Sequence, residues 1–484
     1  MEKSNPIPVT AVFDIGKTNK KFFLFDENYS IIQKKQTSLN QTTDEDGAPC
    51  EDLALLEYWI KNKLEEANKN KEIDIQALNF SGYGASLVHL DKAGNTVTPL
   101  YNYLKPYPED LFDKFYETYG GQKQVSLQTA SPPMGMLNSG LQLFWLKHAK
   151  PFKFEEIEHS LHFPQYLSYL VTGECRAELT SIGCHTVLWN FNQERYHRWL
   201  EQENCLELLA PISPVSYTCS TKSKDIEAEI GIGIHDSSAA LAPYLLGLDN
   251  PFLLVSTGTW SITFNPFNKE PLTYSELRRD CLCYLNIYGE QVKASRLFLG
   301  KEYEHQKEKI NDHFRGATLE KEVELDSILL NKLMKEANPA RKLKLEKAYS
   351  SGPFPKDKPG DWDISQFDSY TEAYHQLMLD LVSIQAESIK LTQDDKKVDK
   401  LIMTGGFSQN DFFIKLLASF FPGKKIYTSS LPNASALGAA MVVNGIEESA
   451  GRQKELKDLL GLESHEPVKG LKVKDYSWKE SVIT

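Results

Sequence analysis

The residues best suited to chemistry stand in short turns that contain glycine and follow apolar runs. The first such stretch spans residues 10–26 and reads as two apolar strands joined by a polar turn around Gly16. A glycine lets the backbone approach a ligand closely, and exposed N–H groups beside cations favour a phosphate. An ordinary hairpin with solvated lysines has the same pattern. The polar residues of this turn are Asp14, Lys17, Thr18, Asn19, Lys20 and Lys21.

The same plan returns about 240 residues later, where residues 252–264 form two apolar runs around Gly258. Two further glycine turns follow apolar runs, at Gly84 and at Gly405-Gly406. Each turn alone is a weak signal, because glycine is common at strand ends. Four together, two of them threonine-containing hairpins, indicate two related domains that each present a phosphate-binding turn.

Asp236 is the best candidate for a catalytic base. Phosphoryl transfer to a hydroxyl needs a carboxylate that accepts its proton, and Asp236 stands at a glycine-rich bend before a small-residue helix. An N-cap of that helix is the alternative role. Asp14 ends an apolar strand, where Mg²⁺ or a backbone turn could satisfy it. His185 and His235 are candidates for the same cleft, although structural hydrogen bonding would also explain them.

Composition excludes several classes of function. The 484 residues carry 54 basic and 66 acidic side chains, a net charge of −12, which argues against a general nucleic-acid-binding surface. The seven cysteines are scattered, as expected for reduced thiols in the cytoplasm. We expect no signal peptide and no membrane helix. The Walker sequence and the protein-kinase signature set are both absent.

The elements that must position these residues alternate between strands and helices. Strands are expected over residues 31–37 and 75–81, and helices over 52–68, 195–209 and 369–391. Residues 178–185 read as a polar loop, and residues 275–358 as charged and irregular in period. Together these segments predict α/β domains with mixed sheets.

The order and spacing of the motifs resemble those of the FGGY carbohydrate kinases, in the actin/hexokinase/Hsp70 ATPase-fold superfamily. The resemblance implies two duplicated actin-like (ribonuclease H-like) α/β domains with mixed sheets flanked by helices and a cleft between them. The expected domains are residues 5–243 and 244–450, followed by a tail, 451–484, that could dock on the first. The segments that carry the resemblance are residues 14–21, 235–236, 255–260 and 405–410.

The resemblance also implies roles for single residues. Asp236 would deprotonate a sugar hydroxyl, and Asp14 would hold Mg²⁺. ATP phosphates would meet Gly16, Lys17, Thr18, Asn19 and Lys21 from the first domain and Gly258 and Thr259 from the second. Adenosine would be held by Gly405, Gly406, Phe407 and Asn410. The sugar would meet Tyr83, Gly84, Ala85, Ser86, Tyr101, Tyr103, His185, His235, Asp236 and Trp260.

Two departures from the family pattern concern the ligands. Residues 101–105 replace a Trp-x-Asp-x-Arg-like segment, and Lys17 replaces a common threonine or small residue. The His-Asp pair with Gly-Thr-Trp resembles rhamnulokinases and fuculokinases, and Trp260 offers an apolar face to a deoxy-sugar methyl group. The expected acceptor is a 6-deoxy-ketose such as L-rhamnulose or L-fuculose.

Three alternatives remain open from the sequence. The first is a kinase for xylulose, ribulose or another polyol. The second is a nucleotide-dependent, sugar-sensing regulatory protein on the same fold. The third is a chaperone-class ATPase, which would need a peptide-binding domain that the sequence does not suggest. A homodimer is compatible with all of them, and neither a nucleic-acid nor a membrane partner is expected.

Overall fold

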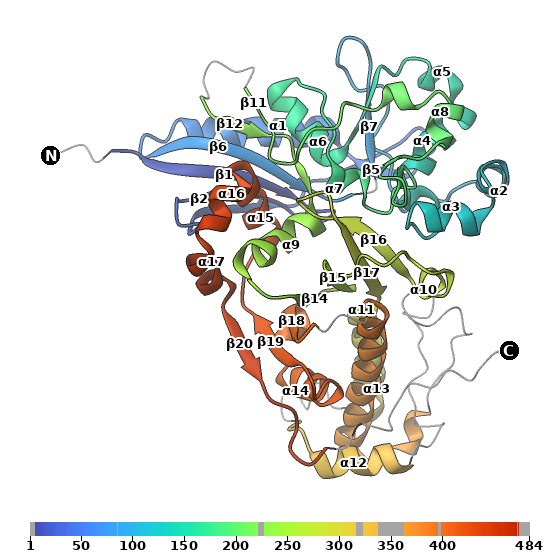
Figure 1. Ribbon diagram of the computed structural model, residues 1–484, viewed down its shortest axis with the longest axis vertical. Coiled ribbons are helices and arrows are strands. Elements are labelled where there is room, and N and C mark those ends of the chain that lie inside the picture. The colour runs from blue at the N-terminus through green and yellow to red at the C-terminus, as the bar shows by residue number, and fades with distance from the viewer. Residues whose placement is uncertain are drawn as a thin grey trace. The chain divides into compact units, whose positions relative to one another are not determined.

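A computed structural model describes residues 5–84, 86–220, 227–315, 323–336, 363–394, 398–471 and 473 (Figure 1). The chain forms two compact units. The first comprises residues 1–248, 283–291 and 432–459, and the second comprises residues 249–282, 292–431 and 460–484. Residues 432–459 therefore return to the first unit after the chain has built most of the second.

The first unit contains a mixed, seven-stranded sheet. Its order is β11 (Thr218–Cys219), β12 (Glu229–Gly231), β6 (Ile73–Gly82), β1 (Ile7–Ile15), β2 (Lys20–Phe25) and β3 (Ile31–Thr37), with β13 (Ile234–His235) also paired to β6. Three small pairs are β4 (Gln41–Thr43) with β5 (Pro49–Glu51), β7 (Leu87–Leu90) with β8 (His159–His162), and β9 (Trp189–Asn190) with β10 (Arg195–Tyr196).

The helices of the first unit come from the N-terminal half of the chain and from the segment that returns to this unit near residue 432. They are α1 (Leu53–Asn68), α2 (Glu109–Thr118), α3 (Gln122–Gln128), α4 (Ser139–Ala149), α5 (Pro151–Phe154), α6 (Phe163–Thr172), α7 (Leu179–Ile182), α8 (Trp199–Gln202), α9 (Asp236–Gly247), α15 (Ala434–Val443), α16 (Ile446–Gly451) and α17 (Gln453–Leu460). Short 3₁₀ turns are η1 (Gly135–Leu137) and η2 (Leu206–Leu208).

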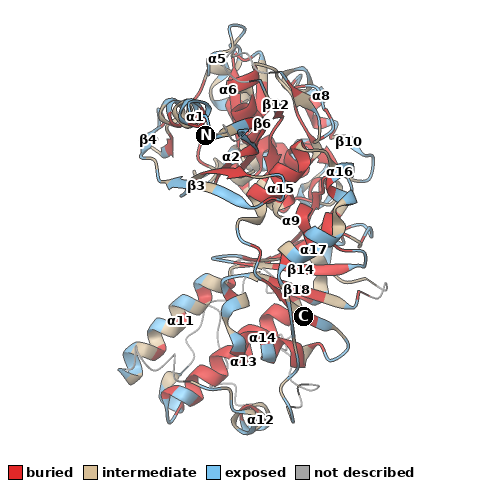
Figure 2. Ribbon diagram, turned by 90° about the vertical axis from the view of Figure 1, so that its left-hand side faces the viewer, coloured by how far each residue is buried: buried red, intermediate tan, exposed pale blue. Residues whose placement is uncertain are grey.

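Aromatic packing joins α1 to the sheet. Asp52 caps α1 by accepting from the N–H of Leu55, and the apolar face of the helix then turns inward. The Phe13 ring of β1 lies 5.4 Å from Trp59 of α1 and 5.5 Å from Phe80 of β6. β1 is buried from Val9 to Ile15, and its neighbour β6 is largely buried, as its red ribbon in Figure 2 shows.

Small residues let α9 and α15 approach closely. A Cβ on Gly438 of α15 would lie 1.8 Å from the carbonyl oxygen of Ala239 on α9, so only glycine fits there. The side chain of Asn79 on β6 donates to the carbonyl of Ala439 at 2.9 Å. These contacts anchor residues 432–443 to β1 and β6, whose ends carry the candidate site.

The second unit repeats the plan of the first. Its sheet has the order β16 (Cys281–Leu285), β17 (Gln291–Leu297), β15 (Ser261–Asn265), β14 (Phe252–Thr257), β18 (Lys400–Gly405), β19 (Lys425–Ser429) and β20 (Leu462–His465). Its helices are α10 (Tyr274–Arg278), α11 (Leu299–Phe314), α12 (Ser327–Glu336), α13 (Tyr370–Leu391) and α14 (Asp411–Phe420), with 3₁₀ turns η5 (Ile364–Gln366) and η6 (Gly406–Gln409).

The duplication is visible in the strand pairing. β1 pairs antiparallel with β2 and parallel with β6, and β14 pairs antiparallel with β15 and parallel with β18. Each central strand thus ends in a hairpin turn beside the carboxyl end of a parallel neighbour. The predicted α/β class with two related mixed sheets is confirmed. None of the helices in the described ranges is both long and apolar enough to cross a bilayer.

Three segments differ from the expected secondary structure. Residues 195–209 form β10, α8 and η2 rather than one helix. β10 pairs with β9 before α8 begins, and Asn204 takes a positive φ of 51° just after α8. Residues 178–185 include the short helix α7, which begins because Glu178 accepts from the N–H groups of Thr180 and Ser181. Within residues 275–358, the described part contains α10, β16, β17, α11 and α12, and residues 316–322 and 337–358 lie outside it.

Candidate functional site

Asp14 occupies the carboxyl end of β1 and is 6 % exposed. Its cross-strand partner in the hairpin is Lys21, whose Nζ lies 3.2 Å from Asp14 Oδ2. The hydroxyl of Ser435 on α15 donates to Asp14 Oδ1 at 3.0 Å. A buried carboxylate needs such partners, since without them its ionised form is strongly disfavoured.

A buried lysine holds the turn that follows Asp14. The N–H of Gly16 donates to the carbonyl of Asn19 at 3.0 Å, which closes the turn. Lys20, 1 % exposed, donates to the carbonyls of Gly16 and Lys17 at 3.0 Å each, and its Nζ lies 2.8 Å from Glu51 Oε2. Thr18 and Asn19 are left exposed at the tip.

Lys17 points toward tyrosines. Its Nζ lies 5.5 Å from the centroid of the Tyr83 ring and 5.2 Å from that of Tyr103. Glu51 Oε1 is 4.0 Å away. Burial lowers the pKa of Lys17, with Glu51 acting in the opposite direction. The ammonium therefore lies over two aromatic rings and is partly shielded from water.

Asp236 is the first residue of α9, and His235 holds the N-cap position without a side-chain cap bond. Desolvation and, after it, the nearby Asp14 carboxylate raise the pKa of Asp236 to about 7, while Ser237 and Lys21 act to lower it. A carboxylate that is desolvated and lies near a like charge keeps its proton to higher pH, which is a usual arrangement in acid–base catalysis. Asp236 can thus accept a proton near neutral pH.

His235 is neutral and fixed in place. Burial lowers its pKa to about 3. Its Nε2 lies 3.0 Å from the Cys184 sulfur and 3.2 Å from Asp236 Oδ1, and its ring stacks on Tyr284 at a centroid distance of 5.7 Å. A Cβ on Gly84 would lie 2.8 Å from the Cys184 sulfur and 2.9 Å from His235 Cδ2. Gly84 therefore makes room for the histidine.

The remaining residues predicted for the sugar divide into two groups. Tyr103 makes an edge contact with Tyr83 at 5.8 Å, and its pKa is raised by burial and then by Asp236, which places it near the candidate base. His185 contacts Tyr284 at 6.2 Å. Tyr101, in contrast, is 2 % exposed, and its hydroxyl donates to Glu45 at 2.6 Å, so it belongs to a structural network.

Two positions of the predicted sugar loop need separate mention. Ser86 is buried, and its hydroxyl has no hydrogen-bond partner among the described residues. Ala85 lies outside the described residues.

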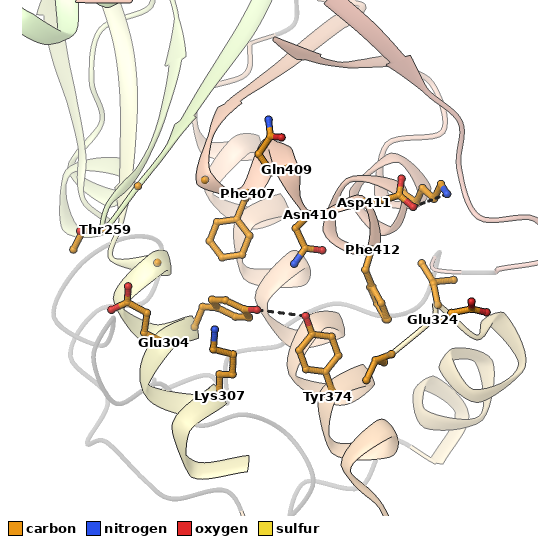
Figure 3. Close-up of a pocket in the computed structure, with 17 residues that line it drawn as sticks. Thr259, Glu304, Lys307, Glu324, Tyr374, Phe407, Gln409, Asn410, Asp411 and Phe412 are labelled. Atoms are coloured by element: carbon orange, nitrogen blue, oxygen red, sulfur yellow. Dashed lines mark hydrogen bonds and ion pairs between the residues drawn. The ribbon is translucent and has the colours of Figure 1, made fainter. Parts of the chain in front are cut away.

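The second unit contains a cavity of about 1130 Å³ (Figure 3). Gly258 and Thr259 of the β14–β15 turn line it together with Gly406, Phe407 and Asn410. Five residues predicted for ATP, from segments almost 150 residues apart, thus share one cavity. The other lining residues are Gly300, Tyr303, Glu304, Lys307, Val323, Glu324, Leu325, Tyr374, Gln409, Asp411, Phe412 and Lys415.

Aromatic rings form much of the cavity wall. Phe407 makes an edge contact with Tyr303 at 5.3 Å, and the hydroxyls of Tyr303 and Tyr374 lie 3.4 Å apart. Figure 3 shows Phe407, Tyr374, Asn410 and Lys307 around the same space. Asn410 also caps α14 by accepting from the N–H of Phe413 at 3.0 Å. The cavity offers flat apolar faces and nearby amide and ammonium donors.

Two predicted residues of the second unit do not line this cavity. Gly405 has a φ of +85°, and a Cβ there would lie 1.8 Å from the carbonyl oxygen of Thr257, so it permits close strand pairing. Trp260 is 39 % exposed, with its ring 4.5 Å from that of Phe298 and 5.5 Å from the Arg296 guanidinium.

Several site residues were not predicted from the sequence. Glu51, Cys184, Tyr284 and Ser435 reach the Asp14–Asp236 region from four separate segments, and Tyr303 and Tyr374 line the cavity from α11 and α13. None stands in a glycine turn. For Ser435 the small-residue run 433–440 was a signal, because it permits a close approach to β1.

Comparisons with known proteins agree with this architecture. The sequence model of the N-terminal domain of the FGGY family of carbohydrate kinases matches residues 9–232, and that of the FGGY carbohydrate kinase C-terminal domain matches residues 249–453. A carbohydrate kinase structure from Novosphingobium aromaticivorans aligns with a TM-score of 0.78 at 22 % identity, covering 95 % of this chain and 97 % of that one. A ligand-bound xylulose kinase from Lactobacillus acidophilus aligns with a TM-score of 0.77 at 16 % identity, covering 96 % and 94 %. These similarities show the fold.

Among curated relatives, a rhamnulokinase of Mannheimia succiniciproducens is 25 % identical over 264 residues, 52 % of each chain. A rhamnulokinase of Bacteroides thetaiotaomicron is 26 % identical over 208 residues, 39 % of this chain and 40 % of the relative. The chain thus spans about half the length of the curated relatives it matches, or less. Both domain models match in order and together span most of the sequence, so the chain belongs to the FGGY family of carbohydrate kinases.

Proposed function

We propose that this protein transfers the γ-phosphoryl group of ATP to a hydroxyl of a ketose. The observation that carries the proposal is Asp236, a carboxylate whose pKa is raised to about 7 beside Asp14 and Lys21. Such a group accepts a hydroxyl proton at neutral pH, and phosphoryl transfer otherwise needs mainly positioning and charge stabilisation. The FGGY membership supports the reaction class.

We propose that residues of both hairpin turns bind the nucleotide. In the second unit, the aromatic cavity at Phe407 suits a purine, and Asn410 supplies a polar group. Gly258 and Thr259 at its edge suit the phosphates, as do Gly16, Thr18, Asn19 and Lys21 in the first unit. The proposed domains in sequence are residues 5–243 for the sugar and the first turn, 244–450 for the second turn and adenosine, and a tail, 451–484. Within the latter two, residues 283–291 and 432–459 pack into the first compact unit.

The donor set fits Mg²⁺ held largely by the nucleotide. The described residues contain no cluster of three or more metal-binding side chains. Asp14 is a single carboxylate with both oxygens hydrogen-bonded, yet carboxylate oxygens accept more than one contact. Mg²⁺ in kinase sites is commonly bound by one or two carboxylates plus phosphates and water. When bound, the ion would neutralise phosphate charge, and Asp14 would hold it.

For the acceptor we propose a 6-deoxy-ketose such as L-rhamnulose or L-fuculose. Support comes from the partial similarity to rhamnulokinases. The structural neighbours named as xylulose, gluconate and glycerol kinases keep other acceptors open. On the first unit, the acceptor would meet Tyr83, Tyr103 and His235, which lie close to Asp236.

A coupled ADP-release assay tests the proposal. L-rhamnulose, L-fuculose, D-xylulose and L-ribulose are each supplied with ATP and Mg²⁺, and at least one should stimulate ADP release. Asp236→Asn should lower kcat roughly 10²–10⁴-fold, because the substitution removes the base while it keeps the shape of the side chain. Nucleotide affinity, measured by calorimetry, should stay within about twofold of wild type. Sugar phosphorylation at a near-normal rate by Asp236→Asn would contradict the proposal.

The regulatory alternative makes a different prediction in the same assay. A sugar sensor would bind nucleotide and sugar without sugar-stimulated ADP release. The raised pKa of Asp236 disfavours it, because a purely binding protein has no need for a proton acceptor at the acceptor site.

A further inference from the structure

Among the described residues, only one carboxylate forms an ion pair with the Lys17 ammonium, and that pair is long. This carboxylate, Glu51, lies 2.8 Å from Lys20 but 4.0 Å from Lys17. The groups that act on Lys17 are Glu51 and Cys50 of β5 and Lys20 of β2. One carboxylate thus serves two ammonium groups. Lys17, Lys20 and Glu51 together keep a net positive charge at a place that is partly shielded from water.

The tyrosines around Lys17 compensate only part of that charge. The faces of Tyr83 and Tyr103, at 5.5 and 5.2 Å, attract a cation weakly compared with an oxygen ligand. The Tyr83 hydroxyl is buried and has no hydrogen-bond partner among the described residues. The Lys17 ammonium and the Tyr83 hydroxyl, which belongs to one of the rings it contacts, each have capacity for a further partner.

Lys17 and its two tyrosines adjoin the candidate base. Tyr103 lies close enough to Asp236 for the carboxylate to raise the tyrosine pKa, and it contacts Tyr83 edge to face at 5.8 Å. Lys17, the two rings and Asp236 thus belong to one neighbourhood of the first unit. Lys21, in contrast, pairs with Asp14 on the next strand, so two lysines of one turn serve different partners.

We propose that Lys17 is a specificity-determining residue for the acceptor, donating a hydrogen bond from its ammonium to a hydroxyl or carbonyl oxygen of the sugar. Tyr83 and Tyr103 form aromatic walls that keep water away from this contact. The inference rests on the proposed kinase function. It assigns Lys17 to the acceptor, although its position in a glycine turn predicts a phosphate contact.

Lys17→Met tests this assignment because methionine keeps much of the apolar stem and removes the charge. We expect the KM for the preferred acceptor, or its Kd measured by calorimetry, to rise roughly 10- to 100-fold, as for loss of a charged hydrogen bond. The KM and Kd for ATP should stay within about twofold. Lys17→Gln, which keeps a neutral donor, should show a smaller rise.

The matched control is Lys34→Met. Lys34 also lies over an aromatic ring, with its Nζ 5.7 Å from the Phe23 centroid, but it is exposed on β3. Its substitution should leave both KM values unchanged. Thermal unfolding of each variant separates a folding defect from a binding defect.

Acceptor analogues that each lack one hydroxyl or the carbonyl oxygen identify the contacted atom. The Lys17→Met penalty should vanish for one analogue and persist for the others, since the contact is already missing in that case. An increase in the ATP KM with an unchanged acceptor KM would overturn the inference while leaving the kinase proposal intact. If wild-type protein turned over none of the sugars, the kinase proposal would fail, and calorimetric sugar binding would still decide the role of Lys17.

Discussion

The two hairpin turns share a backbone plan and differ in what stabilises them. The β1–β2 turn contains a carboxylate and three lysines, and side chains hold it from within: Lys20 binds two of its carbonyls, and Lys21 pairs with Asp14. The β14–β15 turn has no charged residue between Thr257 and Ser261. A duplicated backbone plan can therefore carry several charged side chains in one copy and only uncharged ones in the other.

Neighbouring backbone holds the second turn. The Thr257 hydroxyl donates to the carbonyl of Thr404 at 2.6 Å and accepts from the N–H of Phe407 at 3.0 Å. A Cβ on Gly300 would lie 2.0 Å from the carbonyl oxygen of Gly258. The second turn is thus shaped by the close approach of neighbouring backbone segments, which suits contact with a nucleotide. In the first turn, buried charged side chains are paired with one another. Four substitutions or conditions test this contrast.

Asp14→Asn should have the largest effect. The substitution keeps the shape of the first turn but removes the carboxylate that pairs with Lys21 and would hold Mg²⁺. We expect kcat to fall about 100-fold or more, because charge stabilisation is usually the largest single contribution to catalysis. Steady-state kinetics at several Mg²⁺ concentrations measure the effect. Wild-type kcat in this variant would show that the charge of the first turn is dispensable.

Lys20→Met should mainly lower stability. Lys20 is 1 % exposed, and Glu51, its partner at 2.8 Å, is also buried. Removing one member of a buried pair leaves an uncompensated charge and costs about 3–5 kcal/mol, although the nearby Lys17 would reduce the loss. Urea unfolding measures the change. Lys61→Met, which breaks an i,i+4 pair with Glu57 on α1 in which the lysine is exposed, is the control and should cost under about 0.5 kcal/mol.

Gly300→Ala tests the second turn. The added methyl group meets the backbone of Gly258, so the turn or the start of α11 must shift. We expect the KM for ATP to rise by about tenfold, with the acceptor KM unchanged, since a small displacement of positioning groups weakens binding. Gly423→Ala is the control, because nothing lies within 4 Å of its Cβ position. An unchanged ATP KM in Gly300→Ala would separate this turn from nucleotide binding.

The smallest effect should be a shift in pH dependence. Asp236 must be deprotonated to act as a base, and burial followed by Asp14 raises its pKa to about 7. The rate should therefore rise as pH increases through about 7, well above the range of an ordinary aspartate. Substituting Asp14→Asn should move this rise in the rate to lower pH, because removal of a like charge lowers the pKa of Asp236. A wild-type rate that rises with pH near 4 instead would contradict the role of Asp236.

The sequence predicted both hairpins, the position of Asp236 at the start of a helix, and the mixed α/β class. These depend on local patterns: strand alternation, glycine at a turn and polar residues at a helix start. Five predicted nucleotide residues do share one cavity. The helix expected over residues 195–209 is interrupted in the structure, where Asn204 takes a positive φ. Helical periodicity in the sequence does not reveal such a backbone conformation.

Which side chains contact one another could not be predicted from the sequence. Nothing local indicates that Tyr101 binds Glu45, that Tyr284 stacks on His235, or that Lys17 lies over two tyrosines. Each contact joins segments tens of residues or more apart, and its existence depends on how the sheet and helices pack.

For this protein, local residue order by itself determined where the backbone turns and which residue types stand there. Tertiary structure decided which of those residues share a site and what charge each one meets. The first turn makes the distinction clear. Its three lysines look equivalent in sequence, yet Lys20 is buried against Glu51, Lys21 pairs with Asp14, and Lys17 meets aromatic rings. Burial and neighbouring charge set a side chain's chemistry, and packing of distant segments supplies both.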